Sequence, residues 1–218
     1  MDYKQALESD KRKYLEYYLS LIKIKHPILF SFFPIKDFNI TIIKICLFFF
    51  SFAIYYVFNT IFFDFTIIHK IYKDEGEYNL SYLFPLIFYS FIISYVISSF
   101  IKYIVLSERD LLELKNEKTL RQTHRKVSKI EKCIIIRNVL YFIFSIAFLI
   151  FFWYYLSSFS AVYQNSQVSL IKNTFISFCL SFIYPFLYNL IPGVFRIFSL
   201  TKKNKEFIYK TSKILQLL

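Results

Sequence analysis

Residues 134–159 read IIIRNVLYFIFSIAFLIFFWYYLSSF, an apolar run with one charged side chain, Arg137, near its start. A helix needs about 20 mostly apolar residues to cross the hydrocarbon core of a bilayer. This stretch is therefore predicted to span a membrane. Outward from it, residues 40–63, 82–106 and 171–198 meet the same criterion. Together they predict an all-α membrane protein with four transmembrane helices.

The alternative is a soluble α-protein that buries these helices in its core. The chain has 218 residues, of which 56% are hydrophobic. In a soluble protein of this size, the remaining residues are too few to shield four such apolar helices from water. The same hydrophobic content excludes a disordered chain. With 2 Gly and 3 Cys, collagen-like and disulfide-based scaffolds are excluded as well.

The distribution of Lys and Arg predicts the orientation of the four spans. Seven precede residue 40, eight lie in 107–133 and five follow residue 198, whereas 64–81 carries two and 160–170 carries none. Positive residues concentrate in short cytoplasmic loops. Both termini are therefore predicted to be cytoplasmic. The region 1–21 lacks the long apolar core of a secretory signal peptide.

The two ends of the chain are predicted to form amphipathic helices at the membrane surface. In 1–39, Leu7, Tyr14, Tyr18 and Leu21 fall near helical spacing, and His26-Pro27 is predicted to end that helix. A solvated helix packed on the other cytoplasmic loop remains an alternative. The tail 199–218 alternates apolar residues with lysines, which suits docking on an anionic membrane or on a calmodulin-like partner.

The segment 107–133 is predicted to be a cytoplasmic helical hairpin: helix continued from the second span, a turn near Asn116, and helix leading into the third. Five lysines are candidates for binding anionic lipid headgroups: Lys126, Lys129, Lys132, Lys202 and Lys203. The alternative is that they only set the topology. Four cations near the predicted cytoplasmic ends of the spans are expected to extend towards the headgroups: Lys44, Lys102, Arg137 and Arg196.

Small polar residues recur at helical spacing within two of the predicted spans. Ser90, Ser94 and Ser98 follow one another every four positions, and Ser177 and Ser181 do the same. Such ridges let helices approach closely, so we expect helix packing, with a pore-lining or partner-binding face as the alternative. Asn59 and Asn189 are expected to bond a neighbouring helix or a kinked backbone. Pro185 and Pro192 are each expected to kink the fourth span.

Residue types that carry out catalysis are sparse. His26, His69 and His124 lie in separate loops, and Cys46, Cys133 and Cys179 form no Cys-x-x-Cys pair. The spans hold no Asp or Glu at mid-depth, which argues against an ion-coupled carrier. We therefore predict no enzyme activity, no cofactor, no metal site and no nucleic-acid partner.

The stretch 151–197 resembles a multi-span module found at the C-terminal end of large, uncharacterised protist surface proteins. The motifs that carry the resemblance are Trp153-Tyr154-Tyr155 and Ala161-Val162-Tyr163-x-Asn165-Ser166-Gln167, together with HPILFSFF (26–33), FAIYYVFNTIFF (52–63) and HKIYKDEGEYN (69–79). The chain is also weakly similar to the membrane part of polycystin-like proteins. The resemblance implies a membrane module and supplies no catalytic residues.

These patterns predict a structural or accessory unit of the plasma membrane, an endomembrane or an organelle membrane. Its expected partners are anionic lipids and either another membrane protein or further copies of itself. Two alternatives remain open: a channel subunit with a pore between protomers, and a lineage-specific subunit of an organelle membrane complex.

Overall fold

The computed structural model describes residues 3, 10, 12–35, 37–107, 111, 120–201 and 206–217. Within these residues the regular structure is entirely helical, and four stretches are long and apolar enough to cross a membrane: Thr41–Phe62, Leu80–Val105, Lys126–Val162 and Gln164–Leu200. The predicted all-α, four-span fold class is confirmed. The chain divides into two compact units, residues 36–179 and residues 1–35 with 180–218, and each is described by itself.

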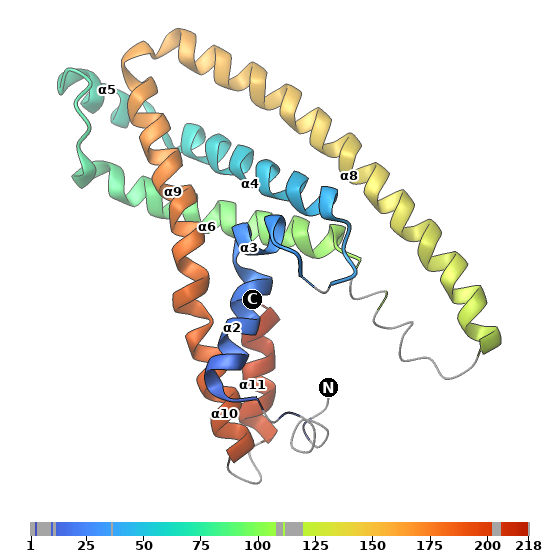
Figure 1. The fold of residues 1–218 in the computed structure, drawn as a ribbon. Coiled ribbons are helices and arrows are strands. Elements are labelled where there is room, and N and C mark those ends of the chain that lie inside the picture. Colours follow the sequence, from blue (N-terminus) through green and yellow to red (C-terminus); the bar gives the residue numbers. More distant parts are fainter. Residues whose placement is uncertain are drawn as a thin grey trace. The chain divides into compact units, whose positions relative to one another are not determined.

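The first unit is built around α4 (Thr41–Phe62), which packs along α6 (Leu80–Val105) (Figure 1). A cluster of buried side chains joins the two helices to α8 (Leu120–Val162): Ile43, Leu47, Phe50, Ile54, Val105 and Tyr141. Phe50 meets the rings of Tyr141 and Phe148 edge-on, with centroids 6.0 and 5.0 Å away. Such edge-to-face pairs add to the free energy gained by burial.

The predicted helical hairpin over 107–133 differs from the structure in its first limb. Helix α6 ends at Val105, and Leu106 is extended, with φ −71° and ψ 136°. The chain leaves the helix here because the backbone N–H of Ser107 donates to the Asn39 Oδ1 atom at 3.1 Å. The second limb and the third span form one helix, α8. The predicted turn near Asn116 lies outside the described residues.

A short helix, α5 (Phe65–Lys73), occupies the connection between the first two spans, where no helix was predicted. Asp64 caps it, because its Oδ1 atom accepts from the backbone N–H of Ile67 at 2.9 Å. Ile67 and Ile71 are buried in a second apolar cluster with Phe63, Leu83, Phe159 and Leu170. The chain then turns through Gly76, whose φ of +84° favours glycine.

The predicted fourth span, 171–198, consists of two helices, α9 (Gln167–Tyr188) and α10 (Leu190–Thr201), separated at Asn189. Pro185 has no N–H to continue the helical ladder. The Asn189 side chain donates to the Pro185 carbonyl at 2.7 Å and competes for that acceptor. Pro192 lies in the first turn of α10, where a missing N–H is tolerated. The break therefore falls between the two prolines.

The second unit holds α2 (Tyr14–Lys25), α3 (Pro27–Phe32), α10 and α11 (Glu206–Leu217). His26 ends α2, as predicted, and also begins the short helix α3. Both α2 and α11 pack on α10. In α11, Tyr209 and Ser212 are buried, whereas Phe207 and Ile214 are exposed. The N-terminal segment therefore packs against helices of the C-terminal segment, a third arrangement besides the two expected from the sequence.

An ion pair fixes the start of α4. The Lys44 Nζ atom lies 3.2 Å from the Asp37 Oδ1 atom, and the two side chains are 3% and 7% exposed. Asn39 donates to the Asp37 carboxylate at 2.9 Å. Lys44 was expected to extend towards lipid headgroups. The structure corrects this, because its ammonium folds back onto a buried carboxylate of its own chain.

We expect the Lys44→Met and Asp37→Asn variants each to lower the free energy of unfolding by about 3–5 kcal/mol, because each leaves a buried partner unpaired. The double variant should recover most of this loss. Unfolding of the purified chain in mixed micelles, followed by circular dichroism, measures all three. The exposed Lys129→Met is the control, with a change within about 0.5 kcal/mol. Additive losses in the double variant would contradict the pairing.

Candidate functional site

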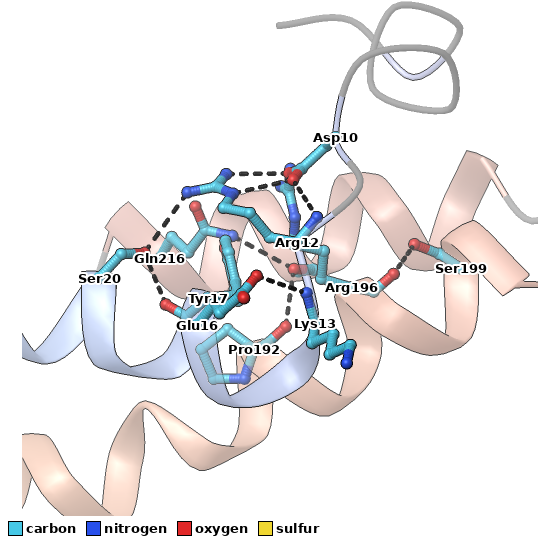
Figure 2. A network of polar contacts seen from close by, with 11 residues as sticks. Asp10, Arg12, Lys13, Glu16, Tyr17, Ser20, Pro192, Arg196, Ser199 and Gln216 are labelled. Carbon is cyan, nitrogen blue, oxygen red and sulfur yellow. Dashed lines mark hydrogen bonds and ion pairs between the residues drawn. The ribbon is translucent and has the colours of Figure 1, made fainter.

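A network of polar contacts surrounds Asp10 in the unit of α2, α3, α10 and α11 (Figure 2). We call it the Asp10 cluster; it comprises Asp10, Arg12, Tyr17, Arg196 and Tyr209. The Asp10 Oδ2 atom pairs with the Arg196 guanidinium, and Oδ1 lies 2.8 Å from the Arg12 Nε atom. The Asp10 side chain is 4% exposed and that of Arg196 is 9%. Both carboxylate oxygens are therefore occupied by guanidinium groups.

Aromatic rings enclose the cations of the Asp10 cluster. The Arg196 guanidinium lies 4.5 Å from the centroid of the Tyr17 ring and 5.5 Å from that of Tyr209, and Arg12 lies 5.2 Å from Tyr17. Such cation–π contacts strengthen when they are shielded from water. Burial raises the pKa of the Tyr17 hydroxyl to about 12, which the positive charge of Arg12 opposes. The Tyr3 hydroxyl adds a bond to the Ser199 carbonyl at 3.1 Å.

Further hydrogen bonds tie α2 to the last part of α9 and to α10. The hydroxyls of Tyr18 and Tyr14 donate to the carbonyls of Phe186 and Leu190, at 3.0 and 3.4 Å. These carbonyls flank the break at Asn189, so α2 covers backbone groups at a helix junction. Gly193 lies under this contact, since a Cβ atom there would come within 2.9 Å of the Tyr14 ring. The N-terminal helix is thus held by a fitted set of contacts.

The structure corrects the expectation for Arg196, which was predicted to reach the headgroups. Its guanidinium is buried against a carboxylate 186 residues away in sequence. Sequence reasoning missed Asp10 and Tyr17 altogether. For Tyr17, a signal was present in its helical spacing with Leu21 and Ile22, because the three side chains form the buried face of α2. The pairing itself has no local signature.

The serine ridge on α6 faces the interior. Ser90 and Ser94 are fully buried, and Ser98 is half-buried. They share a face with Leu83, Ile87 and Val105, the face that packs on α4. Small side chains here allow the two helix backbones to lie close together.

On α9, Ser177 and Ser181 are also buried. Ser177 exchanges hydrogen bonds with the Asn59 amide on α4, at 3.0 and 3.2 Å, and Asn59 also donates to its own Tyr55 carbonyl at 2.8 Å. Asn173, one turn earlier, accepts from the Tyr78 hydroxyl at 2.8 Å. These contacts match the expectation that Asn59 bonds a neighbouring helix, and Asn189 bonds the interrupted backbone at Pro185.

The predicted headgroup lysines Lys126, Lys129 and Lys132 lie on α8 and are exposed, whereas Lys202 and Lys203 lie outside the described residues. Arg137 is half-buried, one turn further along the same helix. At the opposite end of α8, Trp153 and Tyr154 are 70% and 73% exposed. Aromatic residues of this kind concentrate at membrane–water interfaces.

Residues with catalytic or ligating chemistry are not brought together in the described part of the chain. No group of three His, Cys, Asp or Glu side chains there is placed to hold a metal ion. His26 is buried beside the rings of Phe182 and Phe186, and this burial lowers its pKa. The three cysteines are free thiols.

Comparisons with protein-family models, with curated proteins and with solved structures find no match to this chain. The resemblance to the membrane module of protist surface proteins therefore stays a prediction.

We expect Arg196→Met to release α2, because Asp10 then keeps only the half-exposed Arg12. Hydrogen–deuterium exchange of residues 14–25 should accelerate at least about tenfold, which corresponds to 1.4 kcal/mol. Exchange in α4 should not change. Arg12→Met is the matched control and should have the smaller effect. Unaltered exchange in α2 of the Arg196 variant would contradict a holding role for the Asp10 cluster.

Proposed function

We propose that this chain is a non-enzymatic, multi-pass membrane protein that acts as a structural or accessory unit, assembling with partner membrane proteins. One observation carries the proposal: the third span packs poorly within its own chain. Only 11% of its most apolar window is buried, against 44% for the first span. Most of the surface of α8 within the membrane is therefore available to lipid or to a partner.

One part of that surface suits a protein partner better than lipid. Near the predicted outer end of α8, the small residues Ser157, Ser158 and Ala161 are exposed close to one another, whereas the exposed Ala147 has bulky neighbours. Ser157 and Ala161 lie one turn apart on the same face. Lipid provides no hydrophobic drive for association, so helices in membranes associate through small residues that let their backbones approach. We call this surface the Ser157–Ala161 patch.

The buried serine ridge favours assembly over the channel alternative. Ser90 and Ser94 are occupied in packing α6 on α4, so they are not offered to a pore between protomers. A module that packs its own polar residues inward and leaves one span uncovered is suited to joining a larger complex. That role also suits a membrane module of the kind that the chain resembles in protist surface proteins.

We expect affinity purification from native membranes to recover a stoichiometric partner, or further copies of the chain, with the wild type. Ala161→Leu should reduce recovery at least about tenfold, because the added volume separates the backbones at the Ser157–Ala161 patch. Phe151→Leu is the control, on an exposed position about 80° around the helix from Ala161 and about 120° from Ser157. Cysteine placed at Ser157, in a variant lacking the native cysteines, should crosslink to the same species.

Two results would count against the assembly proposal. One is a wild-type chain that leaves native membranes in mild detergent as a monomer. The other is equal recovery of the partner with the Ala161 and Phe151 variants, which would show that the partner does not bind at the Ser157–Ala161 patch. A crosslinked product of twice the chain mass would identify the partner as a second copy.

We further propose that both termini are cytoplasmic, on the strength of the alternating Lys and Arg content of the connections. An epitope tag following Leu218 should be reached by antibody only after cells are permeabilised. A tag inserted between Val162 and Gln164 should be reached in intact cells if the chain resides in the plasma membrane. In an internal membrane, protease protection of sealed vesicles replaces the antibody test. A C-terminal tag on the opposite side would overturn the orientation.

A further inference from the structure

An apolar groove of about 670 Å³ lies between the end of α6 and the first half of α8. Small-molecule sites in proteins occupy about 300–1,000 Å³. Bulky and largely exposed apolar side chains form its walls: Phe100 and Ile104 from α6, and Ile136, Leu140 and Phe144 from α8. In the described part of the chain, the groove is open to whatever surrounds the helices at this depth.

The α8 wall of the groove follows one face of the helix. Its residues recur in an i, i+3, i+4, i+7 pattern: Lys129, Lys132, Cys133, Ile136, Arg137, Leu140, Tyr141 and Phe144. This spacing keeps every member on the side that faces α6. From Lys132 to Phe144 the helix rises about 18 Å, slightly more than the ~15 Å of hydrocarbon in one leaflet.

Charge is confined to one end of the groove. Lys129 and Lys132 are exposed at the end of the groove nearest the start of α8, and Arg137 lines the groove about one turn beyond them. Beyond Arg137, Leu140 and Phe144 continue the α8 wall without charge. From the membrane surface towards the bilayer interior, the lining of the groove thus changes from cationic to apolar. An anionic phospholipid has the complementary order, with an anionic headgroup at the surface and apolar acyl chains in the interior.

We propose that this groove binds one anionic phospholipid, with the phosphate at Lys129, Lys132 and Arg137 and an acyl chain along Leu140 and Phe144. The charge complementarity selects the occupant. A partner helix is disfavoured, because the walls are bulky where close helix packing needs small residues. The inference needs only the membrane-spanning helices and is independent of the proposed assembly with a partner.

The test uses the full-length purified chain in nanodiscs that contain phosphatidylglycerol and phosphatidylcholine in equal amounts. Native mass spectrometry after gentle release measures which lipid stays bound. The wild type should retain one phosphatidylglycerol in clear preference to phosphatidylcholine. Lys132→Gln should weaken that retention about fivefold, which is the effect of about 1 kcal/mol for one basic residue near an anionic lipid surface. Lys73→Gln removes the same charge from an exposed position outside the groove and should leave retention unchanged.

A second pair of variants tests the apolar part of the site. Leu140→Trp should fill the groove and abolish retention while every cation remains. Leu149→Trp is its control, on the same helix outside the groove. Leu140 is 60% exposed, so the larger ring does not disturb a packed core. Ile104→Trp, from the α6 wall, repeats the block independently.

Three outcomes would overturn the proposal. Equal retention of the two lipids by the wild type would show that the groove does not select a lipid by its charge. Equal weakening by Lys73→Gln and Lys132→Gln reduces the effect to general attraction to an anionic surface. Full retention by both Leu140→Trp and Ile104→Trp means that no acyl chain enters the groove. Since the chain is purified alone, none of these outcomes depends on whether it assembles with a partner.

Discussion

A small polar cluster at the shared end of α4 and α6 determines where the first two spans begin and end. Lys44 reaches back to Asp37, Asn39 bonds the same carboxylate, and the other end of the Asn39 amide accepts from Ser107. In hydrocarbon, polar groups without partners are costly, so the chain satisfies them within itself. The cluster couples the entry of one helix to the exit of the next. It thereby fixes the register in which α4 and α6 face each other.

With that register set, α4 serves as the central helix of residues 36–179. Small serine side chains of α6 lie in the interface between α4 and α6, whereas aromatic rings form the contacts of α4 with α8 and α9. Phe178 of α9 meets Phe48, Phe52 and Tyr55 of α4 edge-on. Small residues permit close backbones and rings fill wider gaps. The unequal packing leaves α8 largely uncovered, and the uncovered surface carries both the Ser157–Ala161 patch and the groove that we propose binds a phospholipid.

The sequence predicted the spans well because their signal is local. An apolar run of sufficient length has few alternatives to a membrane helix, and Pro185 together with Asn189 marks a discontinuity from chemistry within one turn. The Asp10 cluster could not be predicted in this way. Its ion pair joins residues 186 positions apart, and neither residue type nor spacing says which carboxylate a cation will meet.

The two corrected cations show the same limit. Lys44 and Arg196 were expected to reach headgroups because a cation near the end of a span has that option. The structure gives both of them buried carboxylates instead. Helix α5 was missed for a different reason: an isolated helix of nine residues is only marginally stable in water, and this one is stabilised by the burial of Ile67 and Ile71. The groove between α6 and α8 depends on which faces of the two helices meet, which only a tertiary structure shows.

The continuity of α8 has a mechanical consequence. Its 43 residues contain no Gly or Pro, and at 1.5 Å per residue they form a rod about 64 Å long, roughly twice the thickness of the hydrocarbon core. Figure 1 shows α8 as one continuous helix, and a helix without a kink couples the orientation of its two ends. A change in the tilt of the membrane-spanning part of α8 therefore changes the direction of its basic part as well.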